Sequence, residues 1–183
     1  QNYLTPEQHI PDEGLPYPWE TCMTMATSWS HVPNDVYKPA DELIEKLCDI
    51  VREGGNFLLN VGPDAQGRLD SAAYNRMEQI GGWMKINKEA IYGTRMYTTY
   101  SQGDRIRFAQ SKDGTRKFIY LFDFPESPVQ ITSMPFQPGA KVRMLVSNRS
   151  VSWKKTAEGV EIRIPKGAKG QSNYVWVLEV MDS

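Results

Sequence analysis

Residues 18–25 read Pro-Trp-Glu-Thr-Cys-Met-Thr-Met, and residues 54–63 read Gly-Gly-Asn-Phe-Leu-Leu-Asn-Val-Gly-Pro. Both are short, largely apolar runs of the kind that buried strands show. Because a helical pattern lies between them, they predict a strand–helix–strand unit, the repeat of an α/β barrel. Chemistry in such barrels sits at strand ends, so the polar residues Glu20 and Asn60 are the first functional candidates.

The flanking sequence predicts two helices. Pro39 opens the first, two acids follow in its first turn, and Gly54 stops it. A second helix begins at Asp70 or Ser71 and runs to about Lys88. Eight strand–helix units need roughly 250 residues, and this segment supplies about two, so we expect it to need a larger N-terminal partner.

The sequence pattern changes from helical periodicity to alternation after residue 94. Short alternating runs separated by turns follow, and Lys-Asp-Gly-Thr at residues 112–115 is a strong hairpin signal. The predicted fold class is therefore α/β plus all-β. We expect residues 1–94 to be the C-terminal segment of a (β/α)8-like catalytic domain and residues 95–183 to be an antiparallel β-sandwich domain.

Composition excludes several function classes. The net charge of −1 gives no argument for nucleic acid or an anionic membrane surface, and no apolar run approaches the length of a membrane-spanning helix. The two histidines, His9 and His31, are expected to be solvent-exposed, and their spacing to Cys22 and Cys48 fits no metal site. We expect buried free thiols, no metal and no cofactor.

The candidate residues each have a chemical and a structural interpretation. Glu20, beside Trp19 on a buried strand, would be desolvated, which favours its protonated form and suits a glycosidase general acid; alternatively it bonds a neighbouring arginine or the backbone. Asn60 either binds a substrate hydroxyl or holds the turn that follows it. Trp29 and Tyr37 either stack on a sugar or pack their own loop.

Four blocks of the sequence, residues 18–22, 28–29, 54–63 and 82–94, resemble the α-L-fucosidases of glycoside hydrolase family 29. Their order and spacing match, and the resemblance covers residues 5–95. The chain departs from the family at Ser30-His31, where Gly-Tyr is common, and Lys88 stands where glycine is common.

The resemblance implies retaining exo-enzymes that release fucose from fucosylated oligosaccharides or glycoconjugates and are secreted, periplasmic or lysosomal. Glu20 matches the family's acid/base position. The aspartate nucleophile has no counterpart here, so the N-terminal part of the barrel is the expected partner and the fragment alone is expected to be inactive. One alternative is a non-catalytic carbohydrate-binding module in which Trp153, Tyr174 or Trp176 contacts the sugar. The other is a β domain that only braces the barrel.

Overall fold

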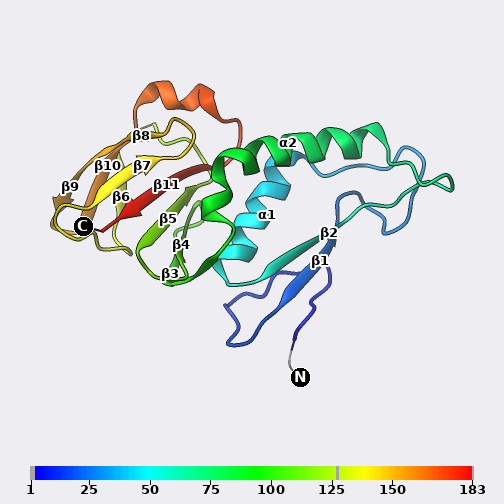
Figure 1. Ribbon diagram of the computed structural model, residues 1–183, viewed down its shortest axis with the longest axis horizontal. Coiled ribbons are helices and arrows are strands. Elements are labelled where there is room, and N and C mark those ends of the chain that lie inside the picture. Colours follow the sequence, from blue (N-terminus) through cyan, green and yellow to red (C-terminus); the bar gives the residue numbers. More distant parts are fainter. Residues whose placement is uncertain (1–2, 127, 183) are drawn as a thin grey trace.

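A computed structural model describes residues 3–126 and 128–182. Its first part carries two parallel strands and two long helices, and its second part is built from antiparallel sheets (Figure 1). None of the helices in the described ranges is both long and apolar enough to cross a membrane.

The predicted strand–helix–strand unit is present. Strand β1 (Glu20–Thr24) pairs in parallel with β2 (Asn56–Asn60), and helix α1 (Ala40–Arg52) connects them. The segment before β1 adds two isolated parallel bridges, Leu4 with Trp19 and Glu7 with Cys22. Closure of a whole barrel stays a prediction.

Local chemistry explains where the helices begin and end. Pro39 is the N-cap of α1, and Gly54 ends the helix region with a positive φ of 77° and an N–H bond to the Val51 carbonyl at 3.0 Å. Helix α2 (Ser71–Asn87) follows Asp70, whose side chain makes no capping hydrogen bond. Lys88–Ala90 form the short 3-10 helix η1.

The β-sandwich is confirmed. A six-stranded sheet has the order β3-β4-β5-β11-β7-β8, and a three-stranded sheet has the order β6-β10-β9. The predicted turn at 112–115 joins β4 to β5, with Gly114 at a φ of 72°. The strand bounds are β3 Thr94–Gln102, β4 Ile106–Ser111, β5 Arg116–Leu121, β6 Val129–Ile131, β7 Lys141–Met144, β8 Arg149–Ser150, β9 Ser152–Thr156, β10 Gly159–Arg163 and β11 Trp176–Met181.

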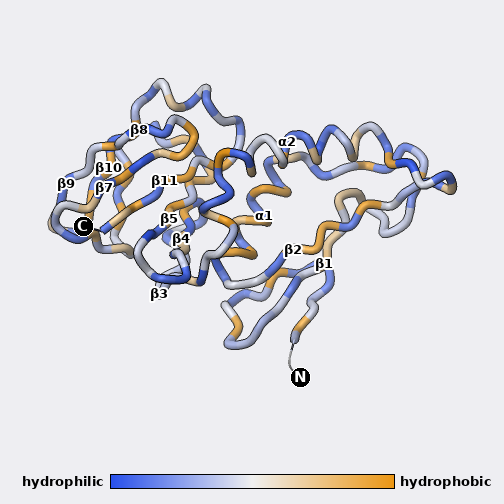
Figure 2. Tube along the Cα trace, in the orientation of Figure 1, coloured by the Kyte–Doolittle hydropathy of each residue, from blue (hydrophilic) through white to orange (hydrophobic). Residues whose placement is uncertain are grey.

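The six-stranded sheet is covered on both faces. One face packs on the three-stranded sheet through a cluster that includes Phe108, Ile119 and Trp176. The other packs on α1 and α2 through a cluster that includes Phe118 and Val177. Figure 2 shows the corresponding apolar positions along the central strands. Neither face of β11 is therefore free, because a central strand between two layers buries alternate residues on both sides.

Candidate functional site

The carboxyl ends of β1 and β2 lie side by side, with Thr24 opposite Asn60. The backbone N–H of Met25 continues the pairing by donating to the Asn60 carbonyl at 2.9 Å. Lys38 closes this end, because its ammonium donates to the carbonyls of Thr24 at 2.7 Å and Ala26 at 3.0 Å. Burial lowers the pKa of Lys38. In barrels this is the end that carries chemistry.

Asp35 organises the loop that follows β1. Its carboxylate accepts hydrogen bonds from the Thr27 hydroxyl, from the Ser28 N–H at 3.1 Å and from the Val36 N–H at 2.7 Å. The hydrogen bond from Thr27 is the main cause that holds the pKa of Asp35 below its ordinary value. The loop therefore presents a fixed carboxylate at the carboxyl end of the strands.

Asp70 ties the same loop to the start of α2. The Tyr37 hydroxyl donates to Asp70 Oδ2 at 3.0 Å, and His31 Nε2 lies 3.3 Å from Asp70 Oδ1. These contacts engage both carboxylate oxygens of Asp70, which makes no capping hydrogen bond to α2. The expectation that His31 is a solvent-exposed loop residue is wrong, because its side chain is 24% exposed and bound to Asp70.

Gly62 lets the two loops approach each other. A Cβ on Gly62 would lie 2.5 Å from the backbone nitrogen of His31, so any other residue here would require the backbone to shift. Asn60 and Asp35 line the cavity between the loops, whose volume of about 10 Å³ is too small for a sugar. The Asn60 Oδ1 atom is buried and accepts no hydrogen bond from the part of the chain that the structure describes.

Glu20 lies at the other end of the strand pair. It is opposite Asn56, at the amino end of β1, whereas Asn60 is at the carboxyl end of β2. By alternation the two side chains share one face of the pair, but four residues separate them, about 13 Å at the usual strand rise. The structure therefore does not bring Glu20 together with Asn60.

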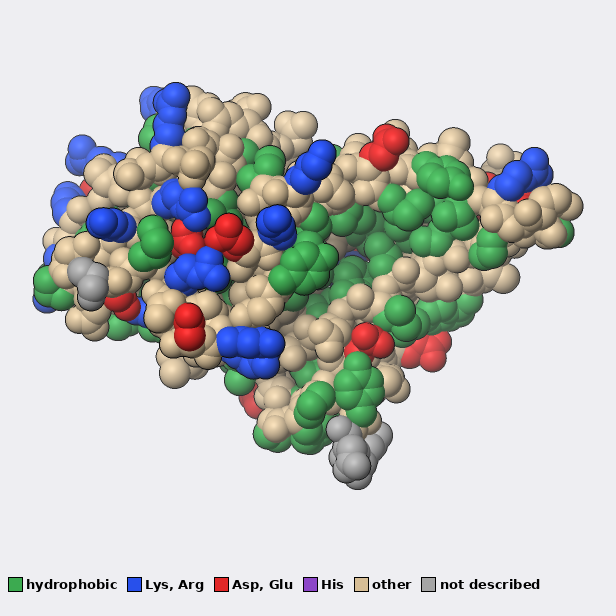
Figure 3. All heavy atoms as spheres, viewed as in Figure 1, with side chains coloured by type: hydrophobic (Ala, Val, Ile, Leu, Met, Phe, Trp, Pro, Cys, Tyr) green, Lys and Arg blue, Asp and Glu red, His purple; other side chains and the backbone are tan. Residues whose placement is uncertain are grey.

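The surroundings of Glu20 are open. The residue is half-buried within the described part of the chain, and its desolvation in a closed barrel stays a prediction. It lines a cavity of about 610 Å³ between β2 and the helices, walled by apolar residues such as Leu43, Leu47 and Met84. Figure 3 shows hydrophobic side chains gathered in this hollow. Trp19, by contrast, is fully buried and packs on Gly55.

The other predicted site residues have simpler surroundings. Trp29 is 39% exposed on the loop after β1, near the carboxyl end. Both cysteines are free, and Cys48 is buried as expected, whereas Cys22 is partly exposed, which corrects the prediction for that thiol. Across residues 3–126 and 128–182, no group of three or more His, Cys, Asp or Glu residues is placed to hold a metal ion.

Comparison with known proteins identifies the family. The sequence model described as Alpha-L-fucosidase matches residues 1–89. The α-L-fucosidase of Dictyostelium discoideum is 30% identical over 175 residues, which are 90% of this chain and 38% of that protein. The chain belongs to the α-L-fucosidase family. Plasma α-L-fucosidase of Rattus norvegicus is 29% identical over 187 residues, covering 95% of this chain and 40% of that protein.

Solved fucosidase structures share the fold of the whole chain. Isoenzyme 1 from Paenibacillus thiaminolyticus superposes with a TM-score of 0.86 at 25% identity, covering 98% of this chain and 45% of that one. The Thermotoga maritima α-fucosidase in complex with a mechanism-based inhibitor gives 0.84 at 26% identity, covering 98% and 42%. The chain thus spans less than half the length of these fucosidase relatives.

The hydrogen bonds at the carboxyl end show which residues the sequence did not reveal. Asp35 and Asp70 carry the polar structure at the carboxyl end of this fucosidase segment, yet Asp35 was not singled out and Asp70 was expected only to cap a helix. A usable signal was present, because both follow predicted strands of a parallel unit, where barrel enzymes place functional groups.

Proposed function

We propose that this chain is part of a retaining α-L-fucosidase that hydrolyses terminal α-L-fucosyl linkages of fucosylated glycans. The family membership of the chain supports this activity, and the polar carboxyl end formed by Asp35, Asn60 and Asp70 supports a site there. The aspartate nucleophile belongs to the N-terminal part of the barrel, which is the proposed partner of this segment. It attacks the anomeric carbon, and a second carboxyl group protonates the leaving oxygen and then deprotonates water.

Two carboxylates of this chain are candidates for that acid/base. The resemblance assigns Glu20, which lies at the amino end of β1. Position favours Asp35, which lines the cavity with Asn60 at the carboxyl end. The hydrogen bonds on Asp35 favour its charged form, as the water-activating step requires, and the acid step requires them to loosen when substrate binds. In a retaining enzyme the acid/base lies about 5–5.5 Å from the nucleophile.

Leaving-group dependence tests the function and the assignment together. In the full-length enzyme, we expect Asp35→Asn to slow the hydrolysis of glycans with poor leaving groups by about 10²–10⁴-fold. The hydrolysis of activated aryl fucosides should slow much less, since these substrates need little proton donation. Glu20→Gln is the matched variant. Selective loss in Glu20→Gln alone would return the role to Glu20, and an enzyme that is inactive on every α-L-fucoside before mutation would overturn the proposed function.

The isolated chain provides a second test. We expect the 183-residue polypeptide, verified by its intact mass of 20.9 kDa, to show no hydrolysis of an aryl α-L-fucoside. The physical reason is that a double displacement needs the nucleophile as well as the acid/base. Measurable turnover by this species would contradict the division of the site between two parts of the barrel.

A further inference from the structure

A third cavity lies where the start of α1 meets the sandwich. Its volume is about 380 Å³, within the range of about 300–1,000 Å³ that small-molecule sites have. Four segments form its walls, namely the first two turns of α1, the turn between β3 and β4, the residues that follow β5, and the segment that leads into β11. The residues that carry the argument are Asp41, Arg105, Phe124, Lys169, Asn173 and Tyr174.

One wall of this junction cavity is formed by residues that pair with one another. Arg105 donates to Asp123 Oδ2 at 2.7 Å and to Glu45 Oε1 at 2.7 Å, and its guanidinium lies 5.3 Å from the centre of the Phe122 ring. The two carboxylates and the guanidinium satisfy one another. They therefore shape the cavity and leave few polar atoms for a ligand.

The remaining polar side chains are unengaged. Those of Lys169, Asn173 and Tyr174 form no hydrogen bond or ion pair with any residue in the described ranges. Asp41 uses one carboxylate oxygen, Oδ1, to accept the Glu42 N–H at 2.9 Å. The cavity thus offers an ammonium, an amide, a phenol and a carboxylate oxygen, a mixture of donors and acceptors on different walls.

Aromatic rings complete the lining in fixed positions. Phe124 and Trp176 meet edge to face, with ring centroids 5.4 Å apart and planes at 69°. The Trp176 indole N–H donates to the Ala168 carbonyl at 3.4 Å, which ties the ring to the loop. An apolar surface beside several free polar groups is the usual composition of a small-molecule site.

We propose that the junction cavity binds a neutral saccharide, at a site separate from the carboxyl-end cluster. A polyol presents many hydroxyls, each of which donates and accepts, and so its chemistry suits each of the four groups. A simple anion would meet the Asp41 carboxylate, and a simple cation would meet the Lys169 ammonium. The C–H faces of a sugar ring suit the aromatic surface.

Direct binding measurements on the 183-residue chain test this proposal. Titration calorimetry and NMR would use L-fucose, D-galactose, N-acetyl-D-glucosamine and 2′-fucosyllactose as probes. We expect at least one to bind and to shift the indole signal of Trp176. Asn173→Ala and Lys169→Met should each weaken that binding by about five- to tenfold, as expected for loss of one hydrogen bond.

Matched controls come from the same loop. Gln171→Ala and Lys166→Met change equally exposed residues that do not line this cavity, so the affinity should stay unchanged. Absence of binding for all four sugars would overturn the proposal, as would binding that ignores both cavity variants. Tighter binding of inorganic phosphate than of any sugar would also overturn it. None of these readouts depends on hydrolysis, so the proposed fucosidase activity stands or fails separately.

Discussion

Glu53 is a buried acid at the end of α1. It is 1% exposed, and Arg52 Nη2 lies 2.7 Å from its Oε1, although neither carboxylate oxygen has hydrogen-bond geometry. Burial raises the pKa of Glu53 from 4.5 to about 7, and the attraction of Arg52 only partly offsets this. The folded state therefore holds a proton that the unfolded chain releases at lower pH.

This bound proton predicts a pH-dependent stability. Above pH 4.5 the unfolded state gains stability by ionising, so the contribution of Glu53 to the free energy of unfolding falls between pH 4.5 and about 7 and is constant above that. Glu53→Gln should remove this fall, which is worth about 3 kcal/mol at 1.36 kcal/mol per unit. Urea unfolding at several pH values measures it, with exposed Glu13→Gln as the control. Parallel stability curves for wild type and Glu53→Gln would contradict the argument.

Replacing two glycines by alanine should change the free energy of unfolding in opposite directions. A Cβ on Gly55 would lie 2.4–2.6 Å from the buried Trp19 ring, whereas one on Gly81 would meet nothing within 4 Å. Gly55→Ala should therefore lower the free energy of unfolding by about 1–3 kcal/mol through overpacking. Gly81→Ala, inside α2, should raise it by about 0.5–1 kcal/mol through helix propensity. Thermal unfolding checks both, and a stabilised Gly55→Ala would show that Trp19 is not packed as described.

At the scale of elements, the loop between β1 and α1 is held by contacts with α2. Asp70→Ala removes the partner of both Tyr37 and His31 while α2 loses no capping bond. We expect amide exchange in residues 27–38 to rise by about tenfold while the rest of α2 is unchanged, since about 1–2 kcal/mol of local hydrogen bonding is lost. Ser71→Ala, exposed and adjacent, is the control. Fraying of the first turn of α2 in Asp70→Ala would instead point to a capping role.

Elements with local signals were predictable from the sequence. Pro39 and Gly54 bound α1, and the turn at 112–115 sets the β4–β5 hairpin, because each acts through its own backbone preferences. Strand β3 was not predicted, because only one of its nine residues, Thr94, is buried and its pairing with β4 shifts register between Met96 and Ser101. Such a strand depends on its partner more than on its own pattern.

The candidate site was less predictable for the same reason. Glu20 and Asn60 were recognised as polar residues of two strands, but their separation follows from the register that places Glu20 opposite Asn56. The contacts of Asp70 join residues 33 and 39 positions apart in the chain. No local pattern encodes such contacts, since they arise only when the two loops pack.

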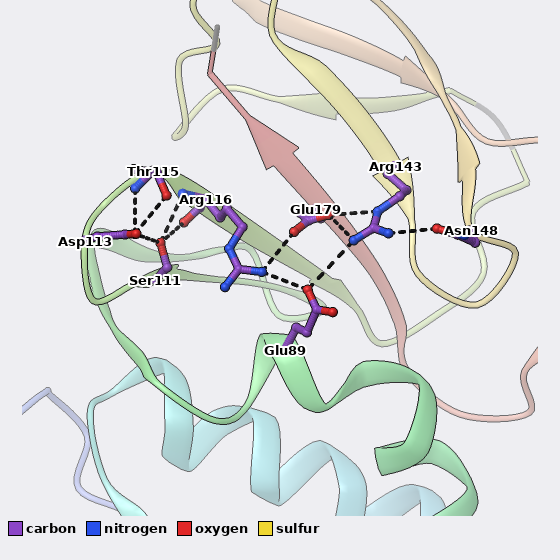
Figure 4. A network of polar contacts seen from close by, with 8 residues as sticks. All are labelled: Glu89, Ser111, Asp113, Thr115, Arg116, Arg143, Asn148 and Glu179. Carbon is purple, nitrogen blue, oxygen red and sulfur yellow. Dashed lines mark hydrogen bonds and ion pairs between the residues drawn. The ribbon is translucent and has the colours of Figure 1, made fainter.

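At the scale of the whole molecule, ion pairs join the α/β part to the sandwich. Arg107 binds Asp49 of α1 at 2.6 Å, and Arg116 binds Glu89 of η1 at 2.7 Å. Figure 4 shows that Arg116 also contacts Glu179, which is 1% exposed and bound by Arg143. Glu89, whose side chain is 49% exposed, is thus part of a network that reaches the centre of the sheet.

A shared core makes the same connection more strongly. Ile44 and Trp83 of the helices lie in one buried cluster with Phe118, Tyr120 and Val177 of the sheet. If the sandwich were cut free near residue 94, this sheet face would be exposed to water. That exposure would cost a free energy of about 25 cal/mol for each Å² of apolar surface. The boundary predicted there separates two architectures that we expect to unfold together, which favours a bracing role for the sandwich.

Ile44→Ala tests this cooperative unfolding. The substitution removes a fully buried side chain from α1 and should cost about 2–5 kcal/mol. Because the cluster spans both parts, amide protection in β5 and β11 should fall by the same free energy as protection in α1, as measured by native-state hydrogen exchange. Val36→Ala, at a residue 71% exposed, should change neither. Loss of protection confined to α1 would mean that the sandwich is stable without the helices, and that it only adjoins the α/β part without bracing it.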